Sequence, residues 1–294
     1  MRVRIIEVGP RDGLQSEKTP VSTQTKAAFV EALTAAGLRE IEATSLVSPK
    51  WVPQLGDAEE LWPLLPPGPL YSALVPNLRG LERAIALGVK RIALFTAASG
   101  DFTKKNINMS VEESLEVAAE VVAGFRESVP YGHVRGYVST AFECPYAGRI
   151  EHTATAKVAQ SLLNIGADEV SLGDTIGAAG PSEVRGLSTV LEIPCEKVAW
   201  HFHDTRGTAI ANVAEAVELG YRTFDASAGG LGGCPYAPGA GGNLATDDLA
   251  YFCEREGLET GVDRFLLAQA SLPVLEAIGR SPAAKAQLAV LAAA

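Results

Sequence analysis

Two kinds of apolar run alternate along this chain. Short runs rich in β-branched residues are followed by longer runs rich in alanine and leucine, whose apolar positions recur with helical spacing. This alternation is typical of strand and helix units arranged around a parallel sheet. Eight strands are predicted, at residues 3–8, 40–43, 70–75, 91–96, 134–141, 169–172, 198–203 and 223–227. Helices are predicted after seven of them, for example at residues 23–36, 78–87, 111–127, 153–165 and 209–219.

Eight such units predict an α/β fold that closes into a (β/α)8 TIM barrel. The competing architecture is an open doubly wound sheet, but no Gly-x-Gly-x-x-Gly follows the first strand. Residues 51–69 are proline-rich and only weakly helical, whereas 262–277 and 281–294 predict additional helices. We therefore expect a single domain over residues 1–294, with 262–294 as a C-terminal helical extension.

Composition narrows the class of protein. Of the 294 residues, 47% are hydrophobic and 20% are charged, which is ordinary for a globular chain. The formal charge of −10 argues against general binding of nucleic acid, which needs a basic surface. Neither an export signal nor a long apolar segment is visible, so we expect a cytoplasmic protein without a membrane partner. The four cysteines show no Cys-x-x-Cys spacing, which argues against a zinc knuckle or a disulfide framework.

His201 and His203 carry the strongest chemical signal. They lie in the strand predicted at residues 198–203, where alternate side chains point to the same face. Two neutral imidazoles on one rigid face are suited to hold a metal ion. The alternative is that one histidine packs in the core while the other forms a hydrogen bond with a neighbour.

The ends of barrel strands and the loops after them carry the working residues of a TIM barrel. Asp12 follows the first predicted strand, and Asn243 lies in a long glycine-rich loop after the eighth. Together with His201 and His203 they predict an octahedral site for Mg²⁺, Mn²⁺ or a similar divalent ion. Such an ion would act as a Lewis acid on a substrate hydroxyl and carboxylate.

Several neighbouring residues have both a chemical and a structural interpretation. Arg11 could stabilise an oxyanion or enolate, or it could form an ion pair with Glu42. Asp174 could orient a ligand histidine or cap the helix predicted near residue 181, and Asn243 could cap the helix that follows it. Cys234 could be an inert packed thiol, but its glycine-rich loop favours a reactive role.

Arg11-Asp12, Glu42, His201-x-His203 and the Gly-Gly-Cys-Pro-Tyr loop around Cys234 together resemble the 3-hydroxy-3-methylglutaryl-CoA lyases, a family of the DRE-TIM metallolyase superfamily. The resemblance covers nearly the whole chain, in segments 7–15, 41–45, 47–54, 103–108, 135–139, 172–177 and 230–236. It implies cleavage of 3-hydroxy-3-methylglutaryl-CoA to acetoacetate and acetyl-CoA. It also implies that Arg11 stabilises the acetyl-CoA enolate and that Cys234 delivers or relays a proton to it. Asp12 and His201 are both candidates for the base.

An acyl-CoA substrate also needs groups that bind it. Lysines in the predicted rim loops could meet its phosphates or carboxylate, namely Lys18, Lys50, Lys104 and Lys105. Gln15, Glu42 and Asp174 are further candidates, either for binding substrate or for supporting the ligands. A homodimer is implied by the resemblance.

Two alternatives remain open. The chain carries Phe142-Glu143 where the family pattern has Leu-Gly, which leaves room for a different 3-hydroxyacyl-CoA, and a related enzyme could run the condensing direction with acetyl-CoA. The other alternative is a barrel that serves as a scaffold without catalysis. Assays with the two substrate classes separate the enzymatic interpretations, and a folded protein that binds no metal would favour the scaffold.

Overall fold

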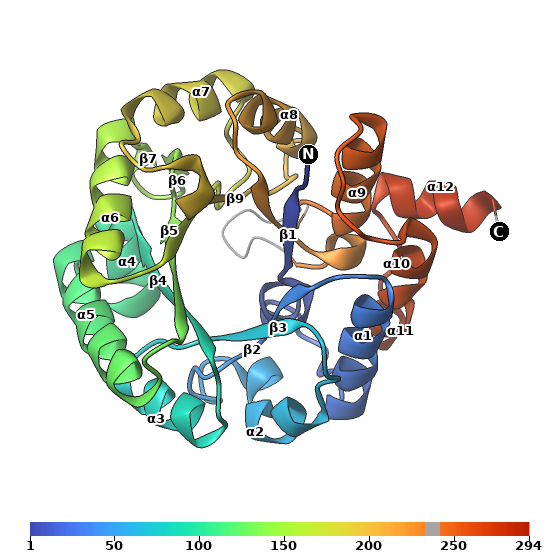
Figure 1. Ribbon diagram of the computed structural model, residues 1–294, viewed down its shortest axis with the longest axis horizontal. Coiled ribbons are helices and arrows are strands. Elements are labelled where there is room, and N and C mark those ends of the chain that lie inside the picture. The colour runs from blue at the N-terminus through green and yellow to red at the C-terminus, as the bar shows by residue number, and fades with distance from the viewer. Residues whose placement is uncertain (233–241, 294) are drawn as a thin grey trace.

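Eight parallel strands close into a barrel, which confirms the predicted fold class (Figure 1). The computed structural model describes residues 1–232 and 242–293. The strands follow the order β1-β10-β9-β8-β5-β4-β3-β2 around the ring. Their bounds are β1 (Arg4–Glu7), β2 (Glu40–Ser45), β3 (Leu70–Leu74), β4 (Arg91–Ala97), β5 (His133–Ser139), β8 (Glu169–Gly173), β9 (Val198–His201) and β10 (Thr223–Ala226). Each overlaps a predicted strand, with ends that differ by at most two residues.

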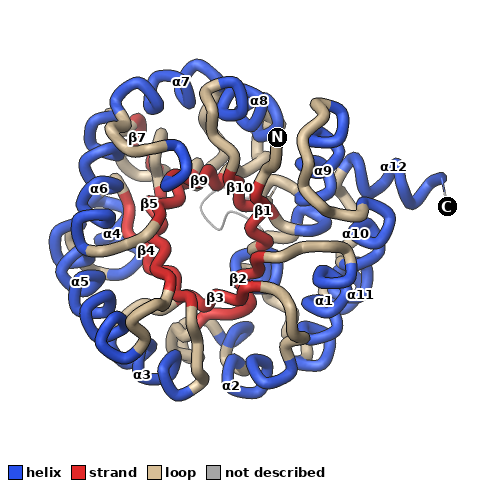
Figure 2. The backbone as a smooth tube through the Cα atoms, viewed as in Figure 1, coloured by secondary structure: helices blue, strands red, loops and turns tan. Residues whose placement is uncertain are grey.

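Helices cover the outside of the barrel, as the tube in Figure 2 shows. They are α1 (Thr23–Ala35), α2 (Ala58–Leu61), α3 (Leu78–Ala86), α5 (Val111–Ser128), α6 (His152–Ile165), α7 (Pro181–Val190), α8 (Ala209–Glu218) and α9 (Thr246–Arg255). The proline-rich segment holds only α2 and the 3₁₀ turns η2 (Pro53–Leu55) and η3 (Trp62–Leu64). Other short turns are η1 (Gly9–Gly13), η4 (Cys195–Lys197) and η5 (Ala228–Gly230). Strands enclosed in this way are buried on both faces, which explains their continuous apolar character.

The loops add two small elements to this frame. A hairpin of β6 (Glu143–Cys144) and β7 (Gly148–Arg149) follows β5, and α4 (Gly100–Ile107) precedes α5. Ser99 caps α4 by accepting a hydrogen bond from the Phe102 N–H. Both additions lie after the carboxyl ends of barrel strands, where they enlarge the rim.

The C-terminal segment differs from the prediction in the number of its helices and in the start of the last one, which begins at Lys285 instead of residue 281. Residues 262–277 form two helices, α10 (Arg264–Ala270) and α11 (Leu272–Ala277), instead of one. The break falls just before Pro273, which has no N–H to donate to the preceding turn. The last helix, α12 (Lys285–Ala293), packs on α9 and α10, and α10 packs on α1.

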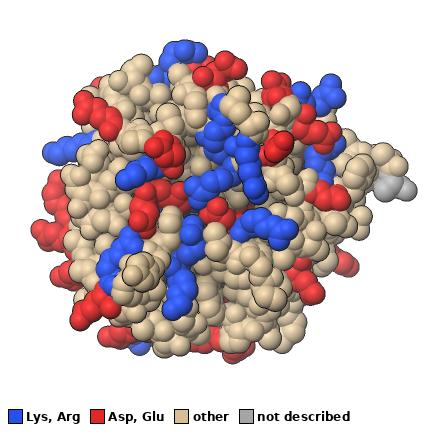
Figure 3. All heavy atoms as spheres, in the orientation of Figure 1, with Lys and Arg blue, Asp and Glu red and all other residues tan. Residues whose placement is uncertain are grey.

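The two ends of the barrel can be told apart in the figures. The strands succeed one another clockwise in Figure 2, which for right-handed crossovers means that the view is onto their amino-terminal ends. In the same orientation, Figure 3 shows basic and acidic side chains gathered over the middle of this face. The carboxyl ends, where catalytic groups are expected, lie on the opposite face.

Candidate metal centre and active site

A single π-helical turn carries Arg11 and Asp12 away from the end of β1. The N–H groups of Arg11, Asp12 and Gly13 all donate to the Val8 carbonyl, at 3.1, 2.7 and 3.1 Å. A Cβ on Gly13 would lie 2.9 Å from the Cβ of Leu231, so only glycine allows this turn to approach the segment after β10 so closely. The packing brings Asp12 beside residues from the other end of the sequence.

His201 and His203 present their imidazoles to one another inside the barrel. Their Nε2 atoms are 3.2 Å apart, and both residues are 8% exposed. Phe202 between them points the other way and stacks on Trp200, with ring centroids 5.6 Å apart. The alternation expected of a strand therefore places both histidines on the inner face.

Asn243 joins the same group from the loop after β10. It forms an isolated antiparallel bridge with His203, and its Nδ2 donates to Oδ2 of Asp12 at 2.9 Å and to the Leu231 carbonyl at 3.2 Å. Its Oδ1 is buried and has no hydrogen-bond partner among the described residues. Asn243 does not cap α9, because Ala245 occupies the N-cap.

These residues fit a divalent cation. One ligand atom each from Asp12, His201 and His203 lies within 4.8 Å of the others, and Asp12 Oδ2 is 3.9 Å from His201 Nε2. Ligand bonds of about 2.1 Å place neighbouring ligand atoms roughly 3 Å apart, close to the separation of the two imidazoles. The unpartnered Asn243 Oδ1 is an oxygen of the kind that Mg²⁺ and Mn²⁺ accept. The four residues named from the sequence are thus brought together.

The electrostatic environment favours the ligating forms of two of these groups. Burial alone would raise the pKa of Asp12, but the adjacent Arg11 guanidinium and the two histidines lower it well below its usual range. Burial and the neighbouring His201 lower the pKa of His203 to about 4. Asp12 is therefore anionic and His203 neutral near pH 7.

Arg11 is held between two carboxylates. Its Nε donates to Oε1 of Glu42 and its Nη1 to Oδ1 of Asp12, and Tyr137 donates to the other Glu42 oxygen at 3.1 Å. The guanidinium carbon lies 5.4 Å from the centre of the Tyr137 ring. Among the described residues, nothing accepts a hydrogen bond from Nη2 of Arg11. The ion pair expected with Glu42 therefore exists, and it leaves one guanidinium nitrogen for another oxygen.

Asp225 is a residue of this site that sequence reasoning missed. Its Oδ2 lies 3.1 Å from Nδ1 of His201 and accepts from Ser171 Oγ at 2.8 Å, while Oδ1 accepts from Arg135 at 2.6 Å. Burial opposes its ionisation, but Arg135 and His201 lower its pKa. The sequence did contain a signal for it: Asp225 is a carboxylate within the strand predicted at 223–227, where a charged side chain that points into the barrel is unusual.

Asp174 does not contact the histidine side chains. Its carboxylate accepts from the N–H groups of Ala178 and Ala179, at 2.9 and 3.0 Å, and so holds the loop before α7. Burial raises its pKa to about 6. Of the two roles considered for Asp174, the structure shows one close to capping, and the carboxylate that contacts the His201 ring is that of Asp225.

The remaining candidates lie farther from the ligand group. Gln15 follows the Asp12 turn, and its Oε1 is buried without a hydrogen-bond partner in the described chain. The four lysines proposed from the sequence are all exposed, namely Lys18, Lys50, Lys104 and Lys105. Lys105 lies 3.8 Å from the centre of the Tyr146 ring. Cys234 lies outside the described residues.

Phe142 points away from the ligand group. It is 2% exposed and stacks on Trp200, with ring centroids 6.1 Å apart, and it meets His152 of α6 edge to face. Glu143 pairs with Arg149 in the β6–β7 hairpin. The departure from the family pattern at Phe142 therefore lies in the layer between barrel and helices.

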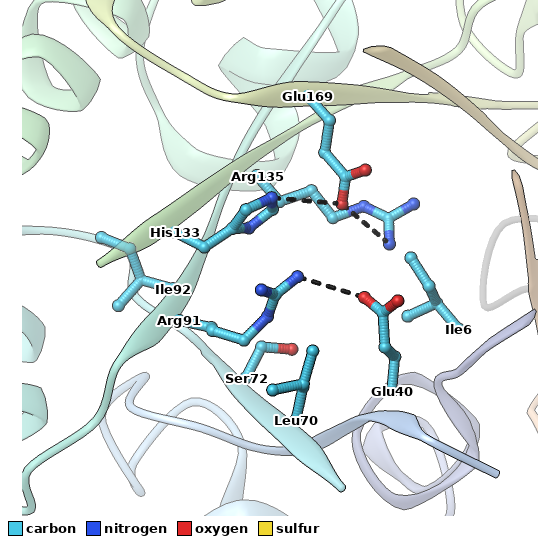
Figure 4. A pocket seen from close by; sticks show the side chains of 9 residues that line it. All are labelled: Ile6, Glu40, Leu70, Ser72, Arg91, Ile92, His133, Arg135 and Glu169. Atoms are coloured by element: carbon cyan, nitrogen blue, oxygen red, sulfur yellow. Dashed lines mark hydrogen bonds and ion pairs between the residues drawn. The ribbon is translucent and has the colours of Figure 1, made fainter. Parts of the chain in front are cut away.

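A second group of charges closes the amino-terminal end of the barrel (Figure 4). Arg4 pairs with Glu40 at 2.9 Å and with Glu169 at 3.0 Å, and Arg91 pairs with Glu40 at 3.1 Å. The cavity among these side chains has a volume of about 10 Å³, at the lower limit for one water molecule. It offers no room for an acyl-CoA.

Comparisons with known proteins point to one family. The HMGL-like family model matches residues 2–274. The chain is 48% identical to the mitochondrial hydroxymethylglutaryl-CoA lyase of Pongo abelii, over 97% of this chain and 88% of that protein. A crystal structure of hydroxymethylglutaryl-CoA lyase from Pseudomonas aeruginosa has a TM-score of 0.96 and 44% identity, and covers 100% of this chain and 98% of that one.

A further similar structure contains coenzyme A. It is an HMG-CoA lyase from Acenitobacter baumannii in complex with coenzyme A and 3-methylmalate, 37% identical, with a TM-score of 0.91 over 97% of this chain and 93% of that one. Within the described residues of the present chain, no helix has the length and apolar character needed to cross a membrane.

Proposed function

The chain belongs to the HMGL-like family of hydroxymethylglutaryl-CoA lyases, and from this premise we propose that it cleaves 3-hydroxy-3-methylglutaryl-CoA to acetoacetate and acetyl-CoA. The observation that carries the proposal is the convergence of Asp12, His201 and His203 at the rim, beside a guanidinium. A carbon–carbon lyase needs both a site for an electrophilic cation and a positive group for the enolate.

Asp12, His201, His203 and Asn243 would hold the divalent ion, and we propose Mg²⁺ or Mn²⁺ because the donors are imidazole, carboxylate and amide groups without thiolate. When bound, the ion supplies Lewis acidity toward the hydroxyl and carboxylate oxygens of the substrate. The residues of the chain provide the remaining functions.

Removal of the hydroxyl proton begins the cleavage. Of the two candidate bases, His201 has both ring nitrogens engaged, because Nδ1 faces Asp225 and Nε2 belongs to the ligand group. Asp12 retains lone pairs beyond its contacts with Arg11 and Asn243. We therefore assign the proton to Asp12, whose lowered pKa makes it a weak base that suffices because a hydroxyl bound to a divalent ion would itself be acidified. As the hydroxyl carbon becomes the ketone of acetoacetate, the electrons of the broken bond pass to the acetyl-CoA enolate.

Arg11 is the group proposed to stabilise that enolate. Its pKa is raised because Glu42 and Asp12 outweigh burial, so the guanidinium stays charged throughout. Nη2 is the nitrogen available for the enolate oxygen. Cys234 is proposed to deliver or relay the proton that completes acetyl-CoA. After one turnover Asp12 has gained a proton and the Cys234 thiol has lost one, so transfer of that proton from Asp12 to the thiolate restores both groups.

The acyl-CoA is the proposed small-molecule partner, supported by the related lyase that holds coenzyme A. Lys18, Lys50, Lys104 and Lys105 are exposed and remain candidates for its phosphates, and Gln15 remains one for the acyl group. A homodimer and a cytoplasmic location complete the proposal. The single-domain organisation, with 262–294 as an extension, belongs to it as well.

The test is release of acetoacetate from 3-hydroxy-3-methylglutaryl-CoA by purified protein, stripped with a chelator and reloaded with Mg²⁺ or Mn²⁺. We expect cleavage to be lost on stripping and restored by either ion. Folded, metal-loaded protein that cleaves only another 3-hydroxyacyl-CoA would move the proposal to that substrate. Condensation of acetyl-CoA with a 2-oxo acid would favour a synthase, and absence of metal binding would favour a scaffold.

A further inference from the structure

We propose that Asp225 is a positioning residue that fixes the orientation and tautomer of His201, and that Arg135 fixes Asp225 in turn. The inference rests on the proposed function, because His201 acts there as a metal ligand. It concerns two side chains in the interior of the barrel, below the rim where the substrate would bind.

The carboxylate of Asp225 is surrounded by donors. It is 1% exposed, and its two oxygens meet His201 Nδ1 at 3.1 Å, Ser171 Oγ at 2.8 Å and Arg135 Nη2 at 2.6 Å. Three contacts from β9, β8 and β5 leave this carboxylate little freedom to rotate. Because its own position is fixed, the Asp225 carboxylate can fix the orientation of the His201 ring.

An ionised carboxylate only accepts hydrogen bonds, so Nδ1 of His201 must carry the proton of the contact. The lone pair of the ring then resides on Nε2, which faces His203 Nε2 at 3.2 Å and Asp12 Oδ2 at 3.9 Å. Without Asp225, the other tautomer would place a proton where the cation is expected. Partners of this kind orient the histidine ligands of many metal sites.

Arg135 connects this contact to the base of the barrel. It is 4% exposed, and its guanidinium lies 5.2 Å from the centre of the Tyr137 ring and 3.9 Å from Glu169. Figure 4 shows Arg135 beside Glu169 in the charged group at the amino-terminal end. Glu169 in turn pairs with Arg4. A chain of charged contacts thus runs from the base of the barrel to His201.

The first experiment measures Mn²⁺ affinity by electron paramagnetic resonance, without turnover. Asp225→Asn is expected to weaken binding about 10- to 100-fold, the usual effect of losing such a partner. Arg135→Lys keeps the charge but loses the planar donor, and is expected to weaken binding less. Glu40→Gln is the matched control: it also removes an interior carboxylate that pairs with arginines, yet it does not contact Asp225 or His201, so affinity should stay unchanged.

A second measurement needs no variant of Asp225. Histidine-labelled, Mg²⁺-loaded wild-type protein is examined by ¹⁵N NMR, which is practical because the chain has four histidines. The signals of His201 are assigned by their loss in His201→Gln. We expect a proton on Nδ1 and none on Nε2. A proton on Nε2 would overturn the inference even if Asp225→Asn failed to fold.

Failure of the inference can be distinguished from failure of the proposed function. If wild-type protein binds Mn²⁺ and cleaves the substrate, but Asp225→Asn binds the ion equally tightly, the inference is wrong and the lyase proposal stands. If wild-type protein binds neither Mn²⁺ nor Mg²⁺, the proposed metal centre itself is wrong. Equal losses in Asp225→Asn and Glu40→Gln would indicate general damage to the barrel and would also reject the inference.

Discussion

The two ends of the barrel both hold buried charges, but they are organised differently. At the amino-terminal end, Arg4 and Arg91 meet the carboxylates of Glu40 and Glu169, so donors face acceptors. At the carboxyl end, the two histidines approach each other by Nε2. Asn243 Oδ1 there faces no donor in the described part of the chain. At the first end carboxylates face guanidinium groups, although Nε and Nη1 of Arg135 and Oε1 of Glu169 have no hydrogen-bond partner in the described chain. The second end gathers imidazole nitrogens and an amide oxygen, which suit the proposed cation.

This difference shows that the number of buried charges does not identify a functional site. Both ends have a cluster of ionisable groups at the ends of strands, and the amino-terminal cluster contains more arginines. What separates them is whether the polar atoms already have partners of opposite character. Substitutions in the ligand group or at Arg11 should therefore change metal binding or turnover, and those that break the pairs of Glu40 with Arg4 and Arg91 should change stability.

His203→Ala should have the largest effect. Loss of a proposed ligand is expected to reduce metal affinity and turnover together, by more than the roughly 100-fold loss typical of an outer partner. Mn²⁺ titration and acetoacetate release measure the two quantities. His152→Ala, a histidine of α6 away from the ligand group, is the control. Full metal affinity in His203→Ala would remove the contrast between the two ends.

Arg11→Lys tests the guanidinium at the same end. It keeps a positive charge but loses the fork that contacts Glu42 and Asp12 together. We expect kcat to fall about 10²- to 10³-fold while metal remains bound. Arg91→Lys makes the same exchange at the amino-terminal end and should leave kcat unchanged. Similar losses in both variants would mean that Arg11 acts only through stability.

Cys234→Ser sharpens the comparison by separating metal binding from proton transfer. We expect kcat to fall about 100-fold, because an alcohol is a weaker acid than a thiol, while Mn²⁺ affinity is retained. Cys195→Ser, at a thiol in the 3₁₀ turn η4, provides the control. A fully active Cys234→Ser would leave the loop thiol without its proposed role.

Glu7 connects stability to pH at the carboxyl end. It is fully buried, accepts hydrogen bonds from Gly9, Ala228 and Thr246, and has a pKa raised from 4.5 to about 7 because burial outweighs these bonds. A raised carboxyl pKa means that the native state is favoured while Glu7 is protonated, and that stability is lost as the pH rises from about 4.5 through about 7.

The Glu7→Gln variant should lack this loss. Relative to the variant, the wild-type free energy of unfolding should fall by at most about 3 kcal/mol across that range, since one pKa unit corresponds to about 1.4 kcal/mol. Urea unfolding at pH 5, 6, 7 and 8 measures the difference. A difference that is constant with pH would show that Glu7 titrates near its usual value.

Glu40→Gln should have the smallest effect. It breaks partly exposed pairs with Arg4 and Arg91, which should cost about 1 kcal/mol of unfolding free energy. Turnover should equal that of the wild type. Urea unfolding and the lyase assay measure the two quantities. A loss of turnover without a loss of stability would show that the amino-terminal charges act on the reaction.

Local patterns were sufficient for most of the fold. The β-branched runs located the eight barrel strands, and the period of two placed His201 and His203 on one face. The helix expected over 262–277 is divided because a single proline outweighs an otherwise favourable run. The π-helical form of the Asp12 turn was not predicted, since it depends on packing against a segment far away in sequence.

From the sequence, only those site residues could be predicted whose type and position alone suggest a chemical role. Asp12, His201, His203 and Asn243 were named, and the structure brings them together. Asp225 was missed because its partner Arg135 is 90 residues away and joins it only across the barrel. Contacts between non-neighbouring strands leave no periodic signal in the chain, so the supports of a site are harder to find than its ligands.

The contact between Asn243 and Asp12 spans 231 residues, and it lies beside the seam where β10 pairs with β1. During synthesis, Asp12 leaves the ribosome long before the two histidines and Asn243. For most of translation it therefore cannot contact these three residues. The ring must close before the four groups can meet. Occupancy of the proposed metal site would therefore report completed folding, and an ion that binds only the closed ring would oppose its reopening by mass action.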